Sequence, residues 1–283
     1  MSKKIASICM NSTSEKEKNI KKAISLVQEA AQKGAEWVLL PEMFTYIGPY
    51  ENSLKTAEDE NGPLNASLSA LAKELGIFLV AGSTGERPEQ TTKGKIISDQ
   101  GISKVYNTLY AFSPEGHIIA KYRKTHMFEL KNIAGETLYS ENSGFLPGNE
   151  IVSINYQDWN IGFAICYDLR FPGFFEKLTK NKALDIIFVP AAFTKATGEA
   201  HWSLLLQSRA VENQCFVVAA NQRGLHGKSK ESFGHSMIID PWGSILSNTY
   251  DQEGIAFASL DLADIKSVRQ KLPCRENRRD DLY

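Results

Sequence analysis

The stretch Gly162–Gly173, GFAICYDLRFPG, decides how this chain is interpreted. It continues an apolar run that begins at Ile161 and leads straight into Cys166, with a tyrosine, an acid and an arginine in the next four positions. A buried strand is therefore predicted to end in a thiol on a charged turn. A free cysteine is by default an inert, buried small residue, so a reactive role for Cys166 has to come from its neighbours.

The bulk composition is that of an ordinary globular protein. The 283 residues are 42% hydrophobic and 23% charged, and the formal net charge is −1. A charge so near zero argues against a surface for nucleic acid or anionic membranes. No run resembles a signal peptide or the roughly 18 apolar residues of a spanning helix. We expect a soluble, cytoplasmic protein that binds neither nucleic acid nor membrane.

The four cysteines are scattered and include no CxxC pair. Neither a zinc site nor a disulfide framework is predicted from them, and the histidine spacings suggest no metal site. We therefore expect no metal and no cofactor. His126, His201 and His235 are interpreted as structural hydrogen-bonding residues, although the Ala-His-Trp context of His201 could also bring it near a site.

Strand-like and helical segments alternate along the chain. Helical periodicity predicts helices over residues 14–33, around 68–75, and near 173–183, 200–214 and 261–272. Ser14 and Glu17 are expected to form a capping box at the first of them. Apolar runs predict strands at 3–10, 35–40, 77–82, 104–113, 117–123, 161–166, 183–190, 215–222, 234–240, 244–248 and 254–261.

Near-continuous apolar strands separated by helices predict an α/β fold in which helices cover the sheets. The segments 104–113 and 117–123 are predicted to form a hairpin, which makes the sheets mixed. No low-complexity linker or short repeat interrupts the pattern, so residues 1–283 are interpreted as one domain. The charged tail at about 273–283 is expected on the surface or against a partner.

Two of the predicted strands end in groups that suit acid–base chemistry. Glu42 follows a strand and a proline, and it is either a solvated loop carboxylate, which its position alone favours, or a general base against an apolar wall. Lys121, Arg123 and Lys124 leave another strand together. A solvated basic edge is the simpler interpretation for the first two, whereas the apolar-leaning segment after Lys124 can draw that residue inward.

Cys166 supplies a third strand end. A thiol becomes a strong nucleophile when a nearby base or cation favours its thiolate. Acyl transfer through a thioester also needs a proton shuttle and an oxyanion site, which a glutamate, a lysine and a backbone N–H can provide. Spacing alone does not establish that the three strand ends meet.

Three motifs join these strand ends. LLPEMF (39–44), KYRKTH (121–126) and GFAICYDLRFP (162–172) resemble the nitrilase, or carbon–nitrogen hydrolase, superfamily in order and spacing. The resemblance extends over nearly the whole chain and includes PAAFTKATGEAHWSLLLQSRAVENQCFVVAAN and GHSMIIDPWG. It implies a four-layer αββα sandwich of two mixed β-sheets flanked by helices.

The resemblance also implies a Glu-Lys-Cys triad. By match to the motifs, Glu42 is the general base, Lys124 the cation and Cys166 the nucleophile. A second glutamate, which the family has ahead of a Pro-Gly pair, corresponds to Glu141. Lys124 and the backbone N–H of Tyr167 are expected to hold the oxyanion, ammonia to leave, and water to hydrolyse the thioester.

Substrate choice has to come from the pocket. Arg170 can pair with Asp168 or clamp a substrate carboxylate, and we favour the clamp. CYDLRFP and AAFTKATGEAHW resemble the Nit amidases, which act on ω-amides of α-keto acids. That similarity implicates Phe193 and Thr197 as substrate-binding residues, although plain core packing competes for Phe193.

Within that branch, YRKTH, SFGHSMIIDPWG and RRDDLY favour an amidase for deaminated glutathione, whereas MFELKNIAG departs from its usual sequence. The alternative is an ω-amidase acting on α-ketoglutaramate and α-ketosuccinamate. A nitrilase, a carbamoylase, an acyltransferase and a non-catalytic binding protein remain further alternatives. Because family members commonly dimerise, we also expect a homodimer or higher homo-oligomer with the tail near the partner, acting on a small amide that carries a carboxylate.

Overall fold

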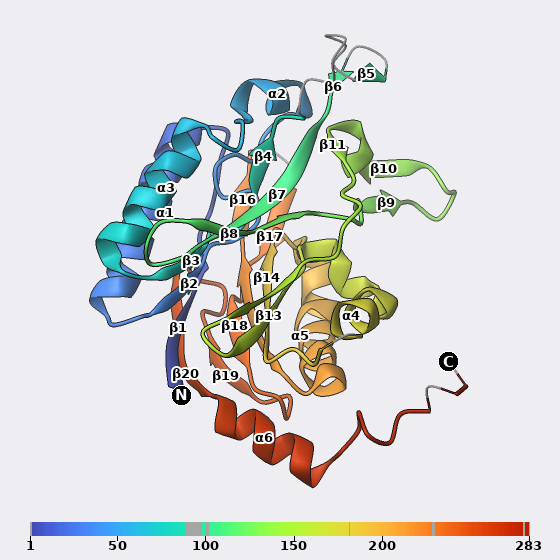
Figure 1. The fold of residues 1–283 in the computed structure, drawn as a ribbon. Coiled ribbons are helices and arrows are strands. Elements are labelled where there is room, and N and C mark those ends of the chain that lie inside the picture. Colours follow the sequence, from blue (N-terminus) through green and yellow to red (C-terminus); the bar gives the residue numbers. More distant parts are fainter. Residues whose placement is uncertain are drawn as a thin grey trace.

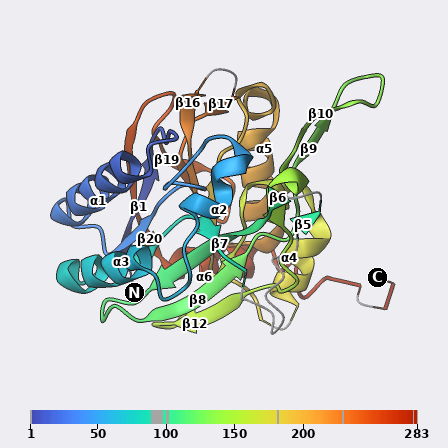
Figure 2. The ribbon, with the colours of Figure 1, turned by 90° about the horizontal axis from the view of Figure 1, so that it is seen from above.

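The computed structural model describes residues 2–88, 98–99, 102–180, 182–227, 230–279 and 281–282. They form two β-sheets packed face to face, with helices on the outer faces (Figure 1). Seen from above, the layers follow one another as helices, sheet, sheet and helices (Figure 2). The predicted αββα sandwich of two mixed sheets is confirmed. The single domain predicted for 1–283 includes residues outside the described ranges and stays a prediction.

The first sheet contains eight strands: β1 (Ser2–Cys9), β2 (Trp37–Leu39), β3 (Phe78–Val80), β4 (Thr84–Glu86), β7 (Val105–Phe112), β8 (Ile118–Arg123), β11 (Phe145–Leu146) and β20 (Gly254–Asp261). Their order is β11-β7-β3-β2-β1-β20, and β4 and β8 also pair with β7. β1, β2 and β3 are parallel, whereas β7 and β20 run antiparallel to their neighbours β3 and β1. The predicted hairpin is the β7–β8 pair.

The second sheet contains six strands: β12 (Ser153–Tyr156), β13 (Trp159–Phe163), β14 (Ile186–Ala191), β15 (Phe216–Asn221), β18 (Met237–Ile239) and β19 (Ile245–Asn248). They are ordered as they occur along the chain. The central strands β13, β14 and β15 are parallel, and the outer pairings are antiparallel. Both sheets are therefore mixed, with parallel strands at their centres; in the first sheet the edge strand β11 also pairs parallel with β7.

Helices cover the two outer faces. On the first sheet lie α1 (Lys16–Gln32) and α3 (Pro63–Leu75), and on the second lie α4 (Pro172–Thr179) and α5 (Lys195–Asn213) (Figure 2). None of the helices in the described ranges is both long and apolar enough to span a bilayer. The remaining short elements are α2 (Ser53–Thr56), α6 (Leu262–Lys271), η1 (Tyr50–Asn52), η2 (Glu141–Ser143), η3 (Cys166–Arg170), and the strand pairs β5 (Ser98–Asp99) with β6 (Ile102–Ser103), β9 (Glu129–Lys131) with β10 (Thr137–Ser140), and β16 (Arg223–His226) with β17 (Lys230–Phe233).

Three helix starts differ from the sequence prediction. The capping box of Ser14 and Glu17 is wrong, because α1 begins at Lys16 and no side chain caps it. Instead, Thr13 and Asn19 organise the entry: the Thr13 N–H donates to Asn19 Oδ1 at 3.0 Å. Helix α3, predicted around 68–75, begins at Pro63, and α5, predicted near 200–214, begins at Lys195.

Side-chain alternation along the first sheet separates two cores. Ile5 and Trp37, which are partners in register, belong to the core between the sheets. The next pair, Ala6 and Val38, points the other way and packs with residues of α1 and α3. A one-residue slip in register would exchange the two sets, so the alternation fixes how the strands pair.

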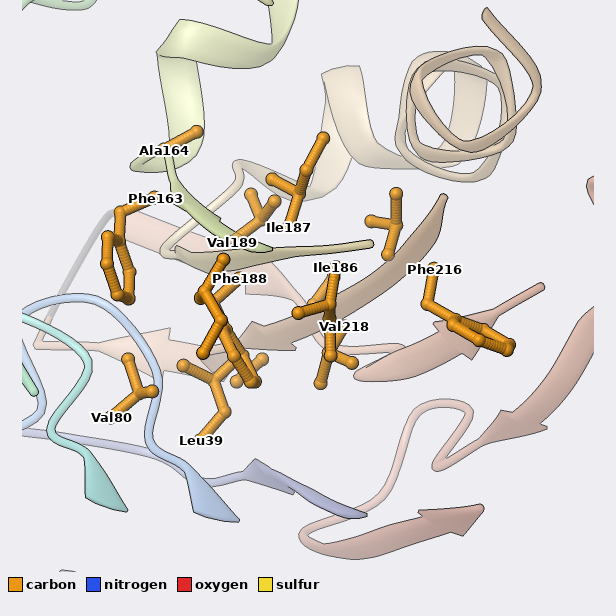
Figure 3. Close-up of a cluster of buried hydrophobic side chains, with 14 of the residues drawn as sticks. Leu39, Val80, Phe163, Ala164, Ile186, Ile187, Phe188, Val189, Phe216 and Val218 are labelled. Carbon is orange, nitrogen blue, oxygen red and sulfur yellow. The ribbon is translucent and has the colours of Figure 1, made fainter. Parts of the chain in front are cut away.

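The core between the sheets is continuous. Leu39 and Val80 extend from the first sheet toward Phe163, Phe188 and Val218 of the second (Figure 3). All five side chains are fully buried. This packing fixes the distance between the strand ends of the two sheets, and those ends carry the candidate site.

Two glycines at either end of the stretch 162–173 offer a test of this packing. A Cβ on Gly162 would lie 2.5 Å from Leu184 Cδ1 and 2.9 Å from Leu178 Cδ2, whereas a Cβ on Gly173 meets nothing within 4 Å. We expect Gly162→Ala to lower the free energy of unfolding by about 1–3 kcal/mol, because two buried leucines must move. Gly173→Ala, within α4, is expected to be neutral or slightly stabilising. Urea denaturation of both variants checks this, and equal effects would contradict it.

Candidate active site

Three strand ends predicted from the sequence converge at one end of the sandwich. Glu42 follows β2 and Lys124 follows β8 of the first sheet, while Cys166 follows β13 of the second. Lys124 Nζ lies 2.9 Å from Glu42 Oε1. Glu42 and Cys166 both line a cavity of about 960 Å³, a size typical of small-molecule sites. The structure therefore brings together the three residues that the motifs had joined.

Cys166 occupies a strained turn. It is the first residue of η3, and its φ of +48° lies in the left-handed region that non-glycine residues seldom adopt. The side chain is only 8% exposed. Strain of this kind persists only where the surrounding structure holds it in place, and it gathers at functional sites.

The Cys166 thiol is not a ready-made thiolate. Burial raises the pKa of Cys166 well above its ordinary value, and the negative charge of Glu42 raises it further. The Lys124 ammonium opposes both effects without cancelling them. The thiol is therefore protonated at neutral pH, and its reaction as a nucleophile needs a base to take the proton.

Glu42 is fully enclosed rather than solvated. Its side chain is 2% exposed, which excludes the loop-carboxylate interpretation. Oε1 accepts hydrogen bonds from Asn107 Nδ2 at 2.8 Å and from Lys124 Nζ at 2.9 Å. Oε2 accepts from the Ala192 backbone N–H at 2.7 Å, a donor contributed by the second sheet. The carboxylate is thus fixed from both sheets.

The backbone around Glu42 is held as tightly as the side chain. Gly82 has a φ of +43°, and a Cβ at that position would collide with the carbonyl oxygen of Pro41. Gln222 Nε2 donates to the Glu42 carbonyl oxygen at 3.0 Å. Gly82 therefore has to be a glycine for the chain to pass so close to the strand end.

Lys124 is buried between two carboxylates. Its Nζ donates to Glu42 Oε1 and to both oxygens of Glu141, at 2.9 and 2.8 Å. Burial opposes the positive charge, but attraction to Glu141 and Glu42 outweighs it and raises the pKa of Lys124 well above its usual value. Burial likewise raises the pKa of Glu141, although Lys124 pulls it down. The ammonium is therefore permanent at physiological pH.

The neighbouring cations Lys121 and Arg123 do not form a solvated edge, and that interpretation is wrong. Both pair with Glu86, which is 3% exposed: Lys121 Nζ lies 2.6 Å and Arg123 Nη2 lies 2.7 Å from Oε1. Glu86 reaches them because β4 pairs with β7, the strand that also pairs with β8. These ion pairs anchor the strand that ends at Lys124.

Asp168 connects the lysine motif to the cysteine motif. Its Oδ2 accepts from the Ile165 N–H at 2.8 Å and from the Tyr122 hydroxyl at 2.6 Å. Its Oδ1 lies 2.7 Å from His126 Nδ1. Asp168 therefore caps the turn that presents the nucleophile, and it does not pair with Arg170, which was the other possibility.

The predicted pocket residues Arg170, Phe193 and Thr197 all line the cavity, as does Tyr167. The Arg170 guanidinium lies 5.2 Å from the centre of the Phe193 ring and 3.3 Å from His201 Nδ1. Phe193 is also packed against Trp202 in the core, so both interpretations of Phe193 apply. Arg170 has no carboxylate partner among the described residues and is available to a ligand.

The sequence did not indicate several residues of the site. Asn107 and the Ala192 N–H both donate hydrogen bonds to Glu42. Asn107 lies inside a predicted strand and Ala192 lies just after another, and the sequence around neither residue indicates a site. Tyr50, Tyr139 and Lys230 also line the cavity. They lie on η1, β10 and β17, short elements whose positions depend on the tertiary fold.

Comparisons with known proteins agree with this geometry. The sequence model of the family described as Carbon-nitrogen hydrolase matches residues 4–270. A mouse protein named deaminated glutathione amidase is 38% identical over 99% of this chain and 84% of its own length. A Xenopus laevis protein named omega-amidase NIT2-A is 34% identical over 95% of this chain and 92% of its own.

Solved structures give the same result. The C. elegans NitFhit protein superposes with a TM-score of 0.87 at 32% identity, over all of this chain and 66% of that longer chain. Saccharomyces cerevisiae Nit3, a nitrilase-superfamily member, gives a TM-score of 0.81 at 29% identity, over 96% and 94%. The chain belongs to the carbon–nitrogen hydrolase family, as its three motifs had indicated.

The buried ion cluster predicts a pH-dependent stability. Lys124→Met leaves two buried carboxylates without a counter-ion, and the pKa of Glu141, which burial already raises, loses the opposing effect of Lys124. A carboxyl group whose pKa is raised in the folded state binds its proton more tightly there, so the free energy of unfolding falls as the pH rises. We expect the free energy of unfolding to fall by about 3–5 kcal/mol at pH 8 and by less at pH 5.5. Urea denaturation at both pH values measures this.

Lys121→Met is the matched control for that experiment. Lys121 is partly exposed, and Arg123 still pairs with Glu86 in its absence. Lys121→Met is expected to lower the free energy of unfolding by about 1 kcal/mol or less. If Lys124→Met lowers the free energy of unfolding equally at both pH values, the loss does not come from carboxylates left without a counter-ion.

Proposed function

We propose that this chain is a cysteine-dependent amidase that hydrolyses deaminated glutathione through a thioester. The observation that carries the proposal is the enclosed cluster of Glu42, Lys124 and Cys166, of which Glu42 and Cys166 line one cavity. It supplies a base, a permanent cation and a protonated thiol. The names of the relatives support an amide as the substrate.

In the first step Glu42 takes the proton from the Cys166 thiol, and the sulfur attacks the amide carbon. The carbonyl oxygen becomes an oxyanion, which is stabilised by the Lys124 ammonium and the backbone N–H of Tyr167 at the start of η3. Glu141 keeps Lys124 in place through two hydrogen bonds. We assign Glu141 this positioning role rather than a proton transfer.

In the second step Glu42 returns its proton to the departing nitrogen as the carbon–nitrogen bond breaks. The identity of the leaving group corrects the expectation of ammonia. Deaminated glutathione joins a keto-acid acyl group to cysteinylglycine, so the leaving amine is that dipeptide, whereas ammonia leaves only from a primary ω-amide. Glu42 then takes a proton from water, hydroxide attacks the thioester, and the Cys166 sulfur regains a proton from Glu42.

Arg170 is proposed to hold the carboxylate of the keto acid. Its guanidinium lines the cavity beside Phe193, and a planar fork of donors suits bidentate binding of a carboxylate. Phe193 packs against the acyl chain in this proposal. The Thr197 hydroxyl, 2.7 Å from Thr194 Oγ1, is placed to hydrogen-bond the keto or carboxylate oxygen.

An ω-amidase acting on α-ketoglutaramate is the second candidate, because one relative carries that name. Both substrates share the keto-acid unit, so the same triad and Arg170 serve either. They differ only in the leaving group. The size of the cavity, about 960 Å³, leaves room for the larger amide and favours the first candidate.

The deciding measurement compares kcat/KM on deaminated glutathione and on α-ketoglutaramate. We expect the wild type to favour deaminated glutathione, and Cys166→Ala to abolish turnover of both. A preference of more than tenfold for α-ketoglutaramate would reverse the assignment. Mass spectrometry of the products distinguishes hydrolysis from acyl transfer to an added amine, and a protein without turnover of any amide would be a binding protein.

We further propose a cytoplasmic homodimer, with the tail at about 273–283 close to the partner. Residues 280 and 283 of this tail lie outside the described residues. The described part of the tail follows α6 and contacts α4, where Arg275 Nη2 donates to the Thr179 carbonyl oxygen at 3.1 Å and Arg278 pairs with Glu176 at 2.7 Å. Analytical ultracentrifugation is expected to give at least twice the 31.5 kDa of one chain. A single species at the monomer mass, with truncation after residue 272 having no effect on it, would contradict the proposal.

A further inference from the structure

Among the described residues, the cavity wall contains two cations without a carboxylate partner. Arg170, Lys195 and Lys230 line the cavity. Lys195 Nζ pairs with Glu231 at 2.9 Å. Within the described ranges, neither Arg170 nor Lys230 forms an ion pair. The proposed function uses Arg170, and it leaves Lys230 without a role.

Lys230 is held by aromatic rings. Its Nζ lies 4.5 Å from the ring centres of both Tyr50 and Tyr139, whose hydroxyls are hydrogen-bonded to each other. Burial lowers the pKa of Lys230, and the charges of Glu141 and Glu51 oppose this only in part. Ring faces attract an ammonium but accept none of its three N–H bonds in the way an anion does. An anionic group in the cavity would stabilise this partly desolvated cation.

The two cations occupy different places on the wall. Arg170 lies over the Tyr167 ring, at 6.0 Å, whereas Lys230 lies over Tyr139. Phe128 connects the two rings, because its centre is 5.1 Å from that of Tyr167 and 5.7 Å from that of Tyr139. A run of three rings therefore leads from one cation to the other. This arrangement suits a ligand with an anionic group at each end.

We propose that Lys230, together with the rings of Tyr50 and Tyr139, binds the terminal carboxylate of the leaving group, so that the site takes amides whose amine part is a peptide with a free C-terminus. This inference rests on the proposed function, in which Arg170 holds the carboxylate of the acyl part. Cys166 then attacks the amide between the two anchored ends. α-Ketoglutaramate has no carboxylate on its leaving group and cannot use Lys230 in this way.

The inference is tested with Lys230→Met, which keeps the aliphatic stem and removes the charge. We expect the variant to lose kcat/KM on deaminated glutathione about 10- to 100-fold more than on α-ketoglutaramate, as for the loss of a charged hydrogen bond. The loss should appear mainly in KM. Converting the glycine carboxylate of deaminated glutathione to an amide should lower kcat/KM of the wild type by a similar factor. The same change should lower kcat/KM of Lys230→Met little further.

Lys195→Met is the matched control. Lys195 lines the same cavity, but its charge is paired with Glu231, so the variant is expected to treat the free and the amidated substrate as the wild type does. Circular dichroism melting of both variants checks that the fold is retained. Equal losses of Lys230→Met on both amides would overturn the inference, because a purely structural role, or one acting through Glu141, does not distinguish leaving groups.

Calorimetric binding to Cys166→Ala separates this inference from the proposed function. If the wild type does not hydrolyse deaminated glutathione, but Cys166→Ala binds it and Cys166→Ala/Lys230→Met binds it at least tenfold more weakly, the carboxylate site stands and the function is wrong. If the wild type hydrolyses deaminated glutathione and the second substitution leaves its affinity and KM unchanged, the function stands and the site is wrong. Absence of any binding would overturn both.

Discussion

The site depends on one buried cation, the Lys124 ammonium between Glu42 and Glu141. Its side chain is fully buried, and a lone charge at such a position would be prohibitively unfavourable. Two carboxylates accept its hydrogen bonds at 2.8–2.9 Å and compensate its charge. Burial, and after it the negative charge of Glu42, keeps the neighbouring thiol protonated.

The same charge balance suits the proposed chemistry. When Glu42 takes the thiol proton and the sulfur attacks a carbonyl, the negative charge passes from the carboxylate to the oxyanion. The buried charge is the same before and after the step, so the surroundings need little reorganisation. A cysteine activated in this way does not need a low pKa, in contrast to one paired with a cationic base. Burial of Cys166 is therefore compatible with its proposed function.

The catalytic cluster exists only where the two sheets meet. The sequence alone predicts only part of this fold and of the candidate site. Near-continuous apolar strands separated by helices predicted sheets covered by helices, and the family resemblance implied the four layers. Only the structure shows that the registered pair Ile5 and Trp37 faces the second sheet. The triad followed from three motifs of a family resemblance, since spacing alone does not tell which strand ends converge. Local rules failed where tertiary partners decide: Lys121 and Arg123 are anchored by Glu86, whose position depends on the pairing of β4 with β7. The Ala192 N–H that fixes Glu42 has no side-chain signature at all.

Catalysis and recognition are assigned to different cations in this cavity, and the geometry explains why. Lys124 already donates to three carboxylate oxygens, so it is occupied and offers a substrate carboxylate little beyond the charge it gives the oxyanion. In the proposed function and the inference that rests on it, the anionic ends of the substrate are bound by Arg170 and Lys230, which line the cavity without carboxylate partners in the described part of the chain. Substitutions at those two positions can alter which amide is bound while the triad keeps its charge balance. One catalytic cluster can in this way serve amides with different leaving groups, and the choice among them is made at the wall of the cavity rather than at the nucleophile.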